Sequence, residues 1–181
     1  LARLQQALDG DELLLHYQPQ IDLRSGQLMG VEALLRWQHP ERGLLTPAHF
    51  LPLLETSGLA LQIGDWVIEQ ALAQAAAWLQ AGVNGGKGLP ISVNVGARQL
   101  RRADFPQRLQ ELLQRRPPEV ARLLNLDVVE ADALAETSAA RALIQRCLAL
   151  GVGVALDDFG AGDSRLSALK QLGVDTLKLD R

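Results

Sequence analysis

The stretch Val152-Gly-Val-Ala-Leu-Asp-Asp-Phe-Gly-Ala-Gly162 decides the fold of this chain, because it combines a strand pattern with two adjacent acids. An apolar run of this length is typical of a buried strand. The run ends at Asp157 and Asp158, whose charges repel each other unless a divalent cation lies between them or one carboxyl group keeps its proton. We therefore predict a buried strand with a candidate metal site at its end. For an isolated Asp-Asp pair, a solvated turn is the alternative.

The same pattern recurs along the chain, where other apolar runs also carry a polar side chain at or near their downstream ends. These side chains are Gln18, Glu32, Asn94, Asp127 and Lys178. In an α/β barrel the C-terminal ends of the strands converge on one face, and that face carries the active site. The recurrence therefore favours one common site over a series of unrelated turns.

The spacing of the runs predicts an α/β fold, a TIM-like (β/α) barrel whose first two strands form an antiparallel hairpin. Residues 13–23 and 27–37 are separated by only three residues, which is too short for a parallel crossover. From residue 90 onward, strand and helix patterns alternate as in right-handed βα units. Since a complete barrel takes about 250 residues, we expect an incomplete barrel that forms a single domain over residues 1–181.

Helical periodicity and helix-ending residues predict the segments that cover this sheet. The predicted helices are 47–56, 66–81 with Asp65 as N-cap, 105–115, 133–150 and 164–172. We expect the single cysteine, Cys147, to be a buried and inert thiol on one of them. We expect the basic residues Arg98, Arg101 and Arg102 to form a solvated helix start.

Composition excludes several classes of protein. Of the 181 residues, 48% are hydrophobic and 4% aromatic, and the net charge is −3, so sequence-independent binding to duplex nucleic acid is not expected. No apolar run reaches the ~18 residues of a membrane span, and no signal-peptide pattern opens the chain. We expect no membrane contact from this segment and a cytoplasmic location. The first residues are already in helical periodicity and the only methionine is Met29, so we expect a longer gene product.

Five ordered blocks carry a resemblance to a known family. They are Tyr17-Gln-Pro19, Glu32-Ala-Leu34, Ser92-Val-Asn94, Asp157-Asp-Phe-Gly160 and Leu177-Lys-Leu-Asp-Arg181. Together they resemble the EAL domain family, bacterial phosphodiesterases that hydrolyse cyclic di-GMP. The tripeptide Glu32-Ala-Leu34 alone carries little information about the family, whereas five blocks in the same order over the whole chain are specific to it.

The resemblance implies a site with two divalent ions, Mg²⁺ or Mn²⁺, that hydrolyses cyclic di-GMP to linear pGpG in bacterial signalling. The metal ligands that it implies are Glu32, Asn94, Asp127, Asp157 and Asp158. The implied catalytic residues are Lys178, Glu32 and Asp157, and the implied substrate contacts are Gln18, Leu35, Arg36 and Asp158. All-oxygen ligation suits these ions better than zinc. The resemblance also implies a possible homodimer and an upstream sensory or cyclase-like domain.

A second interpretation stays open, in which the domain binds cyclic di-GMP as a receptor or interaction module and does not hydrolyse it. Asp127 favours it, because the family usually has glutamate at this position and aspartate is one methylene shorter. The family's last metal-ligating glutamate also lies beyond Arg181. The retained acids and Lys178 favour the enzyme.

Overall fold

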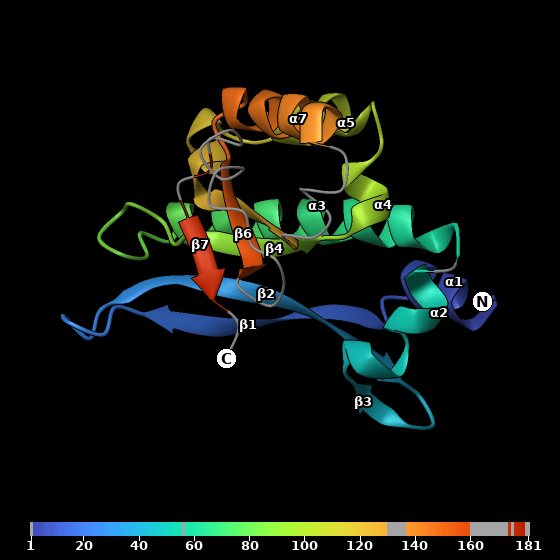
Figure 1. Cartoon of the computed structure of the whole chain (residues 1–181). Coiled ribbons are helices and arrows are strands. Elements are labelled where there is room, and N and C mark those ends of the chain that lie inside the picture. The colour runs from blue at the N-terminus through green and yellow to red at the C-terminus, as the bar shows by residue number, and fades with distance from the viewer. Residues whose placement is uncertain (1, 56, 130–136, 160–173, 175, 180–181) are drawn as a thin grey trace.

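The computed structural model describes residues 2–55, 57–129, 137–159, 174 and 176–179. Its centre is a seven-stranded sheet in the order β1-β2-β4-β5-β6-β7, with β3 paired to β2 (Figure 1). The strands are β1 Leu13–Ile21, β2 Leu28–His39, β3 Gly43–Leu45, β4 Ile91–Val95, β5 Leu124–Val129, β6 Gly153–Phe159 and β7 Thr176–Leu179. The strand pairs β1–β2 and β2–β3 are antiparallel, and every later pair along the order is parallel.

In Figure 1, α3, α5 and α7 lie above the long β1–β2 hairpin, whereas α1 and α2 lie beside the end of the hairpin near β3. The α-helices are α1 Ala2–Asp9, α2 Leu51–Glu55, α3 Leu59–Gln80, α4 Ala97–Leu100, α5 Phe105–Gln114 and α7 Thr137–Ala149. Two 3₁₀ turns, η1 Pro47–His49 and η2 Pro118–Leu123, complete the described elements. No helix in the described part of the chain is long and apolar enough to cross a membrane.

The predicted α/β fold with an antiparallel first hairpin is confirmed. The hairpin register pairs Leu13 with Trp37 and Gln18 with Glu32. Within the described residues, β1 and β7 are the two edges of the sheet, which therefore forms an open barrel. The order of the parallel strands follows the chain order, as right-handed βα units require.

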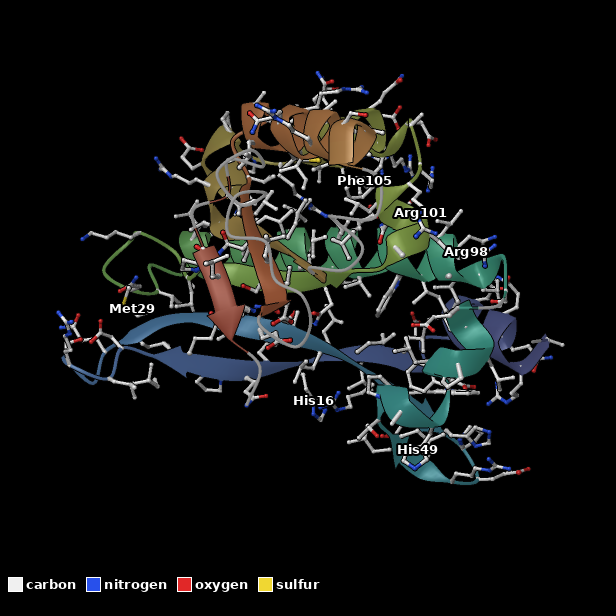
Figure 2. The ribbon with its side chains drawn as sticks, in the orientation of Figure 1. His16, Met29, His49, Arg98, Arg101 and Phe105 are labelled. Carbon is white, nitrogen blue, oxygen red and sulfur yellow. The ribbon has the colours of Figure 1, made fainter. Side chains whose placement is uncertain are left out.

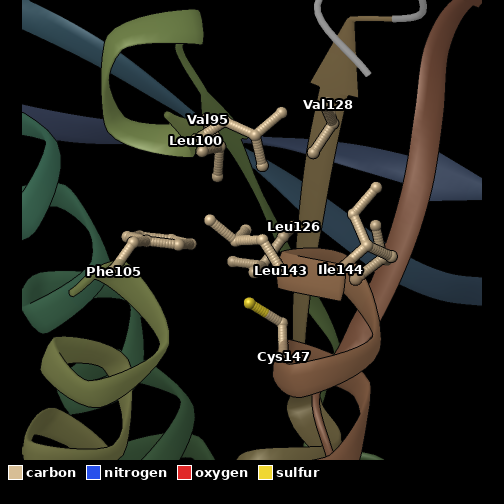
Figure 3. Close-up of a pocket in the computed structure, with 9 residues that line it drawn as sticks. Val95, Leu100, Phe105, Leu126, Val128, Leu143, Ile144 and Cys147 are labelled. Carbon is tan, nitrogen blue, oxygen red and sulfur yellow. The ribbon is translucent and has the colours of Figure 1, made fainter. Parts of the chain in front are cut away.

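The core fills the space between the outer face of the sheet and the helices. Leu126 on β5 is 2% exposed and faces Phe105, Ile144 and Cys147 from α5 and α7 (Figure 3). The space between these side chains has no room for a water molecule. Full burial of each aliphatic or aromatic side chain stabilises the fold by roughly 1.5–3 kcal/mol. The predicted burial of Cys147 is confirmed, and desolvation raises its thiol pKa to about 11.

The prediction that Asp65 caps a helix starting at residue 66 is wrong. Helix α3 begins at Leu59, because Leu59, Ile63 and Val67 recur every four residues on one apolar face and continue the helix through Gly64. Asp65 therefore lies inside α3. Its carboxylate accepts hydrogen bonds from Gln99 and Arg102, at 3.2 and 3.4 Å.

Other predicted helices differ in detail. Segment 47–56 divides into η1 and α2, and the helix predicted over 133–150 is described as α7, residues 137–149. The helix predicted over 164–172 lies outside the described residues. The three-residue strand β3 was not predicted, because so short a run has no readable alternation.

Gly64 permits the close approach of α4 to α3. A Cβ atom at this position would lie 2.5 Å from Oε1 and 2.8 Å from Cδ of Gln99, whose side chain is buried. In an open helix, Gly64→Ala would stabilise by about 1 kcal/mol. Here we expect it to lower the free energy of unfolding by about 1 kcal/mol, since overpacking costs roughly 1–3 kcal/mol.

Urea denaturation of a double-mutant cycle checks this sign. In a Gln99→Ala background the clash is absent, so Gly64→Ala is expected to become stabilising. A stabilising effect of Gly64→Ala in the wild-type background would contradict the close contact.

Candidate functional site

The alternation of side chains along paired strands places the predicted polar residues on one face of the sheet. Glu32 lies level with Ser92 across the β2–β4 pair, and Asn94, two residues further on, therefore shares its face. Asn94 in turn lies level with Asp127 across the β4–β5 pair. Gln18 is the direct partner of Glu32 on β1 and completes this part of the face.

The same register extends the face to the last two strands. Asp127 lies level with Ala155, two residues before Asp157 on β6. Ala155 lies level with Thr176, two residues before Lys178 on β7. This shared face, opposite to the helix-covered one, is called the inner face below. Its functional side chains are Gln18, Glu32, Asn94, Asp127, Asp157 and Lys178.

Two side chains of the inner face are joined by a hydrogen bond between distant parts of the chain. The amide Nδ2 of Asn94 donates to Oε1 of Glu32 at 2.9 Å. The bond orients both groups and leaves the second carboxylate oxygen of Glu32 available to a ligand, since an ionised carboxylate has about four lone-pair sites.

Asp127 is the most deeply buried acid of the site. Its side chain has no exposed area, and its Oδ2 atom accepts a hydrogen bond from Nζ of Lys178, which is 22% exposed. Its Oδ1 atom is buried and has no hydrogen-bond partner among the described residues. An unpartnered buried carboxylate oxygen is costly, so this atom is a candidate donor to a bound cation.

Burial raises the pKa of Asp127 from its ordinary 3.8 to about 6. The hydrogen bond and positive charge of Lys178 act in the opposite direction, while the negative charges of Glu32 and Asp157 raise the pKa further. The three acids therefore repel one another across the inner face. A cation bound there would relieve this repulsion.

A pocket of about 600 Å³ opens beside these acids. Asn94 and Asp127 are among the residues that line it, so the pocket is continuous with the inner face. Its apolar walls come from β2 and from α2 and α3, and its rim comes from α4. The apolar lining residues include Leu34, Leu35, Leu51, Leu54, Ala60 and Ile63.

The remaining predicted substrate contacts have different surroundings. Leu35 packs against the core and lines the pocket wall. Arg36 is half-buried on β2, where its Nη1 donates to the carbonyl of Leu35 at 2.8 Å. Gln18 is exposed. Asp158 belongs to β6, and its side chain lies outside the described ones.

The donor chemistry of the inner face fits a hard divalent cation. Carboxylate and amide oxygens are the ligands that Mg²⁺ and Mn²⁺ prefer, and one of them, Oδ1 of Asp127, is buried without a partner. Within the described residues, no group of three acids, histidines or cysteines is already gathered in metal-binding geometry.

Sequence analysis missed the contacts of two arginines in and just after α4, of which Arg98 lines the pocket. Arg98, Arg101 and Arg102 were predicted to be solvated; Arg98 and Arg101 are exposed, as predicted, whereas Arg102 is half-buried. Arg98 donates to two backbone carbonyls, at 2.8 and 2.6 Å, and Arg102 pairs with Asp65 and Asp104. No signal in the sequence predicts these contacts, because a basic run at a helix start is usually solvated.

Comparison with known proteins identifies the family. A model of the EAL domain matches residues 1–181, the whole chain. The chain belongs to the EAL domain family. The family expected from the five blocks is thereby confirmed.

Two relatives are named as enzymes of cyclic di-GMP metabolism. The chain is 42% identical over 178 residues to the bifunctional diguanylate cyclase/cyclic di-GMP phosphodiesterase MucR of Pseudomonas aeruginosa, covering 98% of this chain and 25% of MucR. It is 39% identical over 178 residues to the cyclic di-GMP phosphodiesterase PdeR of Escherichia coli, covering 98% of this chain and 26% of PdeR. The chain thus spans about a quarter of the length of these relatives.

The solved structure of the P. aeruginosa MucR phosphodiesterase in complex with cyclic di-GMP has the same fold. The TM-score is 0.91 at 40% identity, covering 99% of this chain and 71% of the solved chain. The EAL fold of this chain is therefore established by sequence and by structure.

Proposed function

We propose that this EAL domain hydrolyses one phosphodiester bond of cyclic di-GMP and releases linear pGpG. The observation that carries the proposal is the convergence of three acids, an amide and a lysine on one face beside a pocket of about 600 Å³. The names of MucR and PdeR, which are cyclic di-GMP phosphodiesterases, support it.

The residues of the inner face and the neighbouring Asp158 have separate tasks in this proposal. Glu32, Asn94, Asp127 and Asp157, together with Asp158, would hold Mg²⁺ or Mn²⁺, and the Asn94–Glu32 hydrogen bond orients the first two. When bound, such ions neutralise charge on the phosphoryl oxygens and lower the pKa of a water molecule. Lys178 places a positive charge next to Asp127, where negative charge develops on the phosphodiester.

The pocket walls and the two polar residues of the hairpin would bind the nucleotide. The leucine-lined wall, which includes Leu35, suits a flat heterocycle. Arg36 would donate to a phosphate through its planar guanidinium, and Gln18 would donate from the opposite strand. The homodimer and the upstream domain that the family resemblance implies stay predictions.

A second candidate function is a receptor that binds cyclic di-GMP without turnover. The ion pair between Asp127 and Lys178 favours it, because it occupies one oxygen of an acid that would otherwise be available to a cation. The shorter side chain of aspartate also reaches less far into the site than glutamate.

An assay on the purified full-length protein separates the two functions. Chromatographic detection of pGpG with Mg²⁺ or Mn²⁺, and its loss with a chelator, would support the enzyme. Binding by calorimetry without product would support the receptor. If the protein neither binds cyclic di-GMP nor forms pGpG, the proposal is rejected.

Arg36→Ala is expected to weaken cyclic di-GMP binding by about 1.5–3 kcal/mol, the contribution of hydrogen bonds to charged groups. Arg36→Lys is expected to recover only part of this loss, because an ammonium cannot form two parallel hydrogen bonds to a phosphate. Calorimetric titration with cyclic di-GMP measures the dissociation constant of both variants. Arg42→Ala, at an exposed position between β2 and β3, is the matched charge control. Unchanged affinity in Arg36→Ala would remove Arg36 from the site.

A further inference from the structure

We infer that Arg98 is a positioning residue of the pocket, which holds the apolar wall in place for the nucleobase and takes no part in the chemistry at the phosphodiester. The inference rests on the proposed function, because it assigns the pocket to part of the same ligand. It concerns a residue outside the acidic inner face and outside the motifs that identify the family.

Arg98 joins the rim of the pocket to the turn between two wall helices. Its Nη1 donates to the carbonyl of Glu55 at 2.8 Å and to the carbonyl of Ser57 at 2.6 Å. Glu55 is the last residue of α2, and Ser57 lies two residues before the start of α3. Figure 2 shows Arg98 at the end of the molecule where α4 and these two helices meet. One guanidinium thus binds carbonyls on both sides of the turn.

Other hydrogen bonds at the α2–α3 turn, among the described residues, lie within the turn itself. The hydroxyl of Ser57 donates to the carbonyl of Leu54 at 2.8 Å and accepts from the amide of Leu59 at 3.2 Å. These bonds are local, so they shape the turn without attaching it to the sheet. The bonds from Arg98 span 41 and 43 residues in sequence and add a polar link from the turn to α4, beside the core packing of Leu54.

Helix α4, which carries Arg98, is itself rigidly placed. Gln99 is 4% exposed, packs against Gly64 and donates to Asp65 of α3 at 3.2 Å. Helix α4 also follows β4 closely and begins three residues after Asn94. Arg98 therefore connects the α2–α3 turn to a helix that is fixed next to β4 and its Asn94.

The chemistry of the pocket indicates which part of the ligand depends on this connection. The walls supplied by α2 and α3 include the apolar residues Leu51, Leu54, Ala60 and Ile63, together with Glu55. An apolar wall favours a base over a phosphate, which needs donors or cations. Loss of Arg98 should therefore weaken contacts with the base and leave the reacting phosphodiester unaffected.

Steady-state kinetics on the full-length protein with two substrates tests the inference. Arg98→Ala is expected to raise KM for cyclic di-GMP about tenfold or more. With bis(p-nitrophenyl) phosphate, a small phosphodiester without a purine, kcat/KM is expected to stay within twofold of wild type. Arg98→Lys, which keeps a donor, is expected to give an intermediate KM.

Arg101→Ala is the matched control, because Arg101 is an exposed residue just after α4 and has no side-chain hydrogen bond within the described residues (Figure 2). Its KM is expected to equal that of wild type. Thermal unfolding of each variant identifies any that do not fold, and Arg98→Lys then decides the comparison. If the wild-type protein binds without turnover, the same variants are compared by Kd, with the same expected ratio.

Two results would overturn the inference while leaving the proposed function intact. One is an unchanged KM for cyclic di-GMP in Arg98→Ala. The other is an equal loss of kcat/KM on both substrates, which would show a general structural role. A wild-type protein that neither binds nor hydrolyses cyclic di-GMP would instead reject the proposed function, and the inference with it.

Discussion

Asp157→Asn is expected to reduce kcat/KM for cyclic di-GMP by about 10³-fold or more, because it removes a negative charge from the inner face without changing the size of the side chain. The charge of Asp157 reaches Asp127, whose pKa it raises, so the two acids share one electrostatic environment. A metal-assisted phosphodiesterase depends on such acids for several kcal/mol of transition-state stabilisation. Product formation in saturating Mg²⁺ measures the change.

Asp9→Asn is a matched control, since it makes the same substitution on the exposed surface of α1. Its activity is expected to equal that of wild type. An Asp157→Asn protein that keeps more than a tenth of the wild-type rate would show that the chemistry does not depend on this acid. That result would be consistent with the receptor function only if the wild-type protein also formed no pGpG.

The inner face could be predicted from the sequence because each strand has its own apolar pattern and the parallel strands pair in chain order. Each polar residue stands at the end of its own apolar run, and parallel strands in chain order bring these ends together. Glu32 and Asn94, 62 residues apart in sequence, therefore meet as a hydrogen-bonded pair. The resemblance supplied their expected roles, which the geometry alone does not assign.

The pocket rim could not be predicted in the same way. Arg98 binds backbone carbonyls, and a carbonyl has no signature in the amino-acid sequence. Asp65 looked like an N-cap because acidic residues often occupy that position, and only the packing of α3 shows that the helix starts earlier. Patterns in the sequence therefore do not predict contacts between a side chain and the backbone, or contacts between two helices.

The metal-free protein is expected to lose stability as the pH rises from about 4 to about 6, through the ionisation of Asp127. The pKa of this acid is about 6 in the folded state, above its ordinary value of 3.8. Between these two values the folded protein binds more protons than the unfolded chain, so the free energy of unfolding falls as pH rises. The total change is at most about 3 kcal/mol, at 1.36 kcal/mol for each pKa unit.

Urea denaturation of wild type and Asp127→Asn across this range isolates the effect of Asp127 and its electrostatic coupling to Glu32, Asp157 and Lys178, because titrating groups far from Asp127 contribute equally to both proteins. The wild type should lose stability relative to the variant up to about pH 6, and the difference should then stay constant. A difference that does not change with pH would mean that Asp127 is not desolvated in the folded protein.

Adding Mg²⁺ or Mn²⁺ at pH 7 should reverse this loss, because a cation bound to the ionised Asp127 replaces the missing solvation and relieves the repulsion from Glu32 and Asp157. At a hundred times the dissociation constant, the expected gain in stability is about 2.7 kcal/mol. Asp127→Asn should show a smaller gain, and Asp127→Glu should keep both the gain and the hydrolysis rate, or raise the rate. If metal does not stabilise Asp127→Glu, the site is adapted to the shorter acid and its ion pair with Lys178. If the wild-type protein also forms no pGpG, that result favours the receptor over the enzyme.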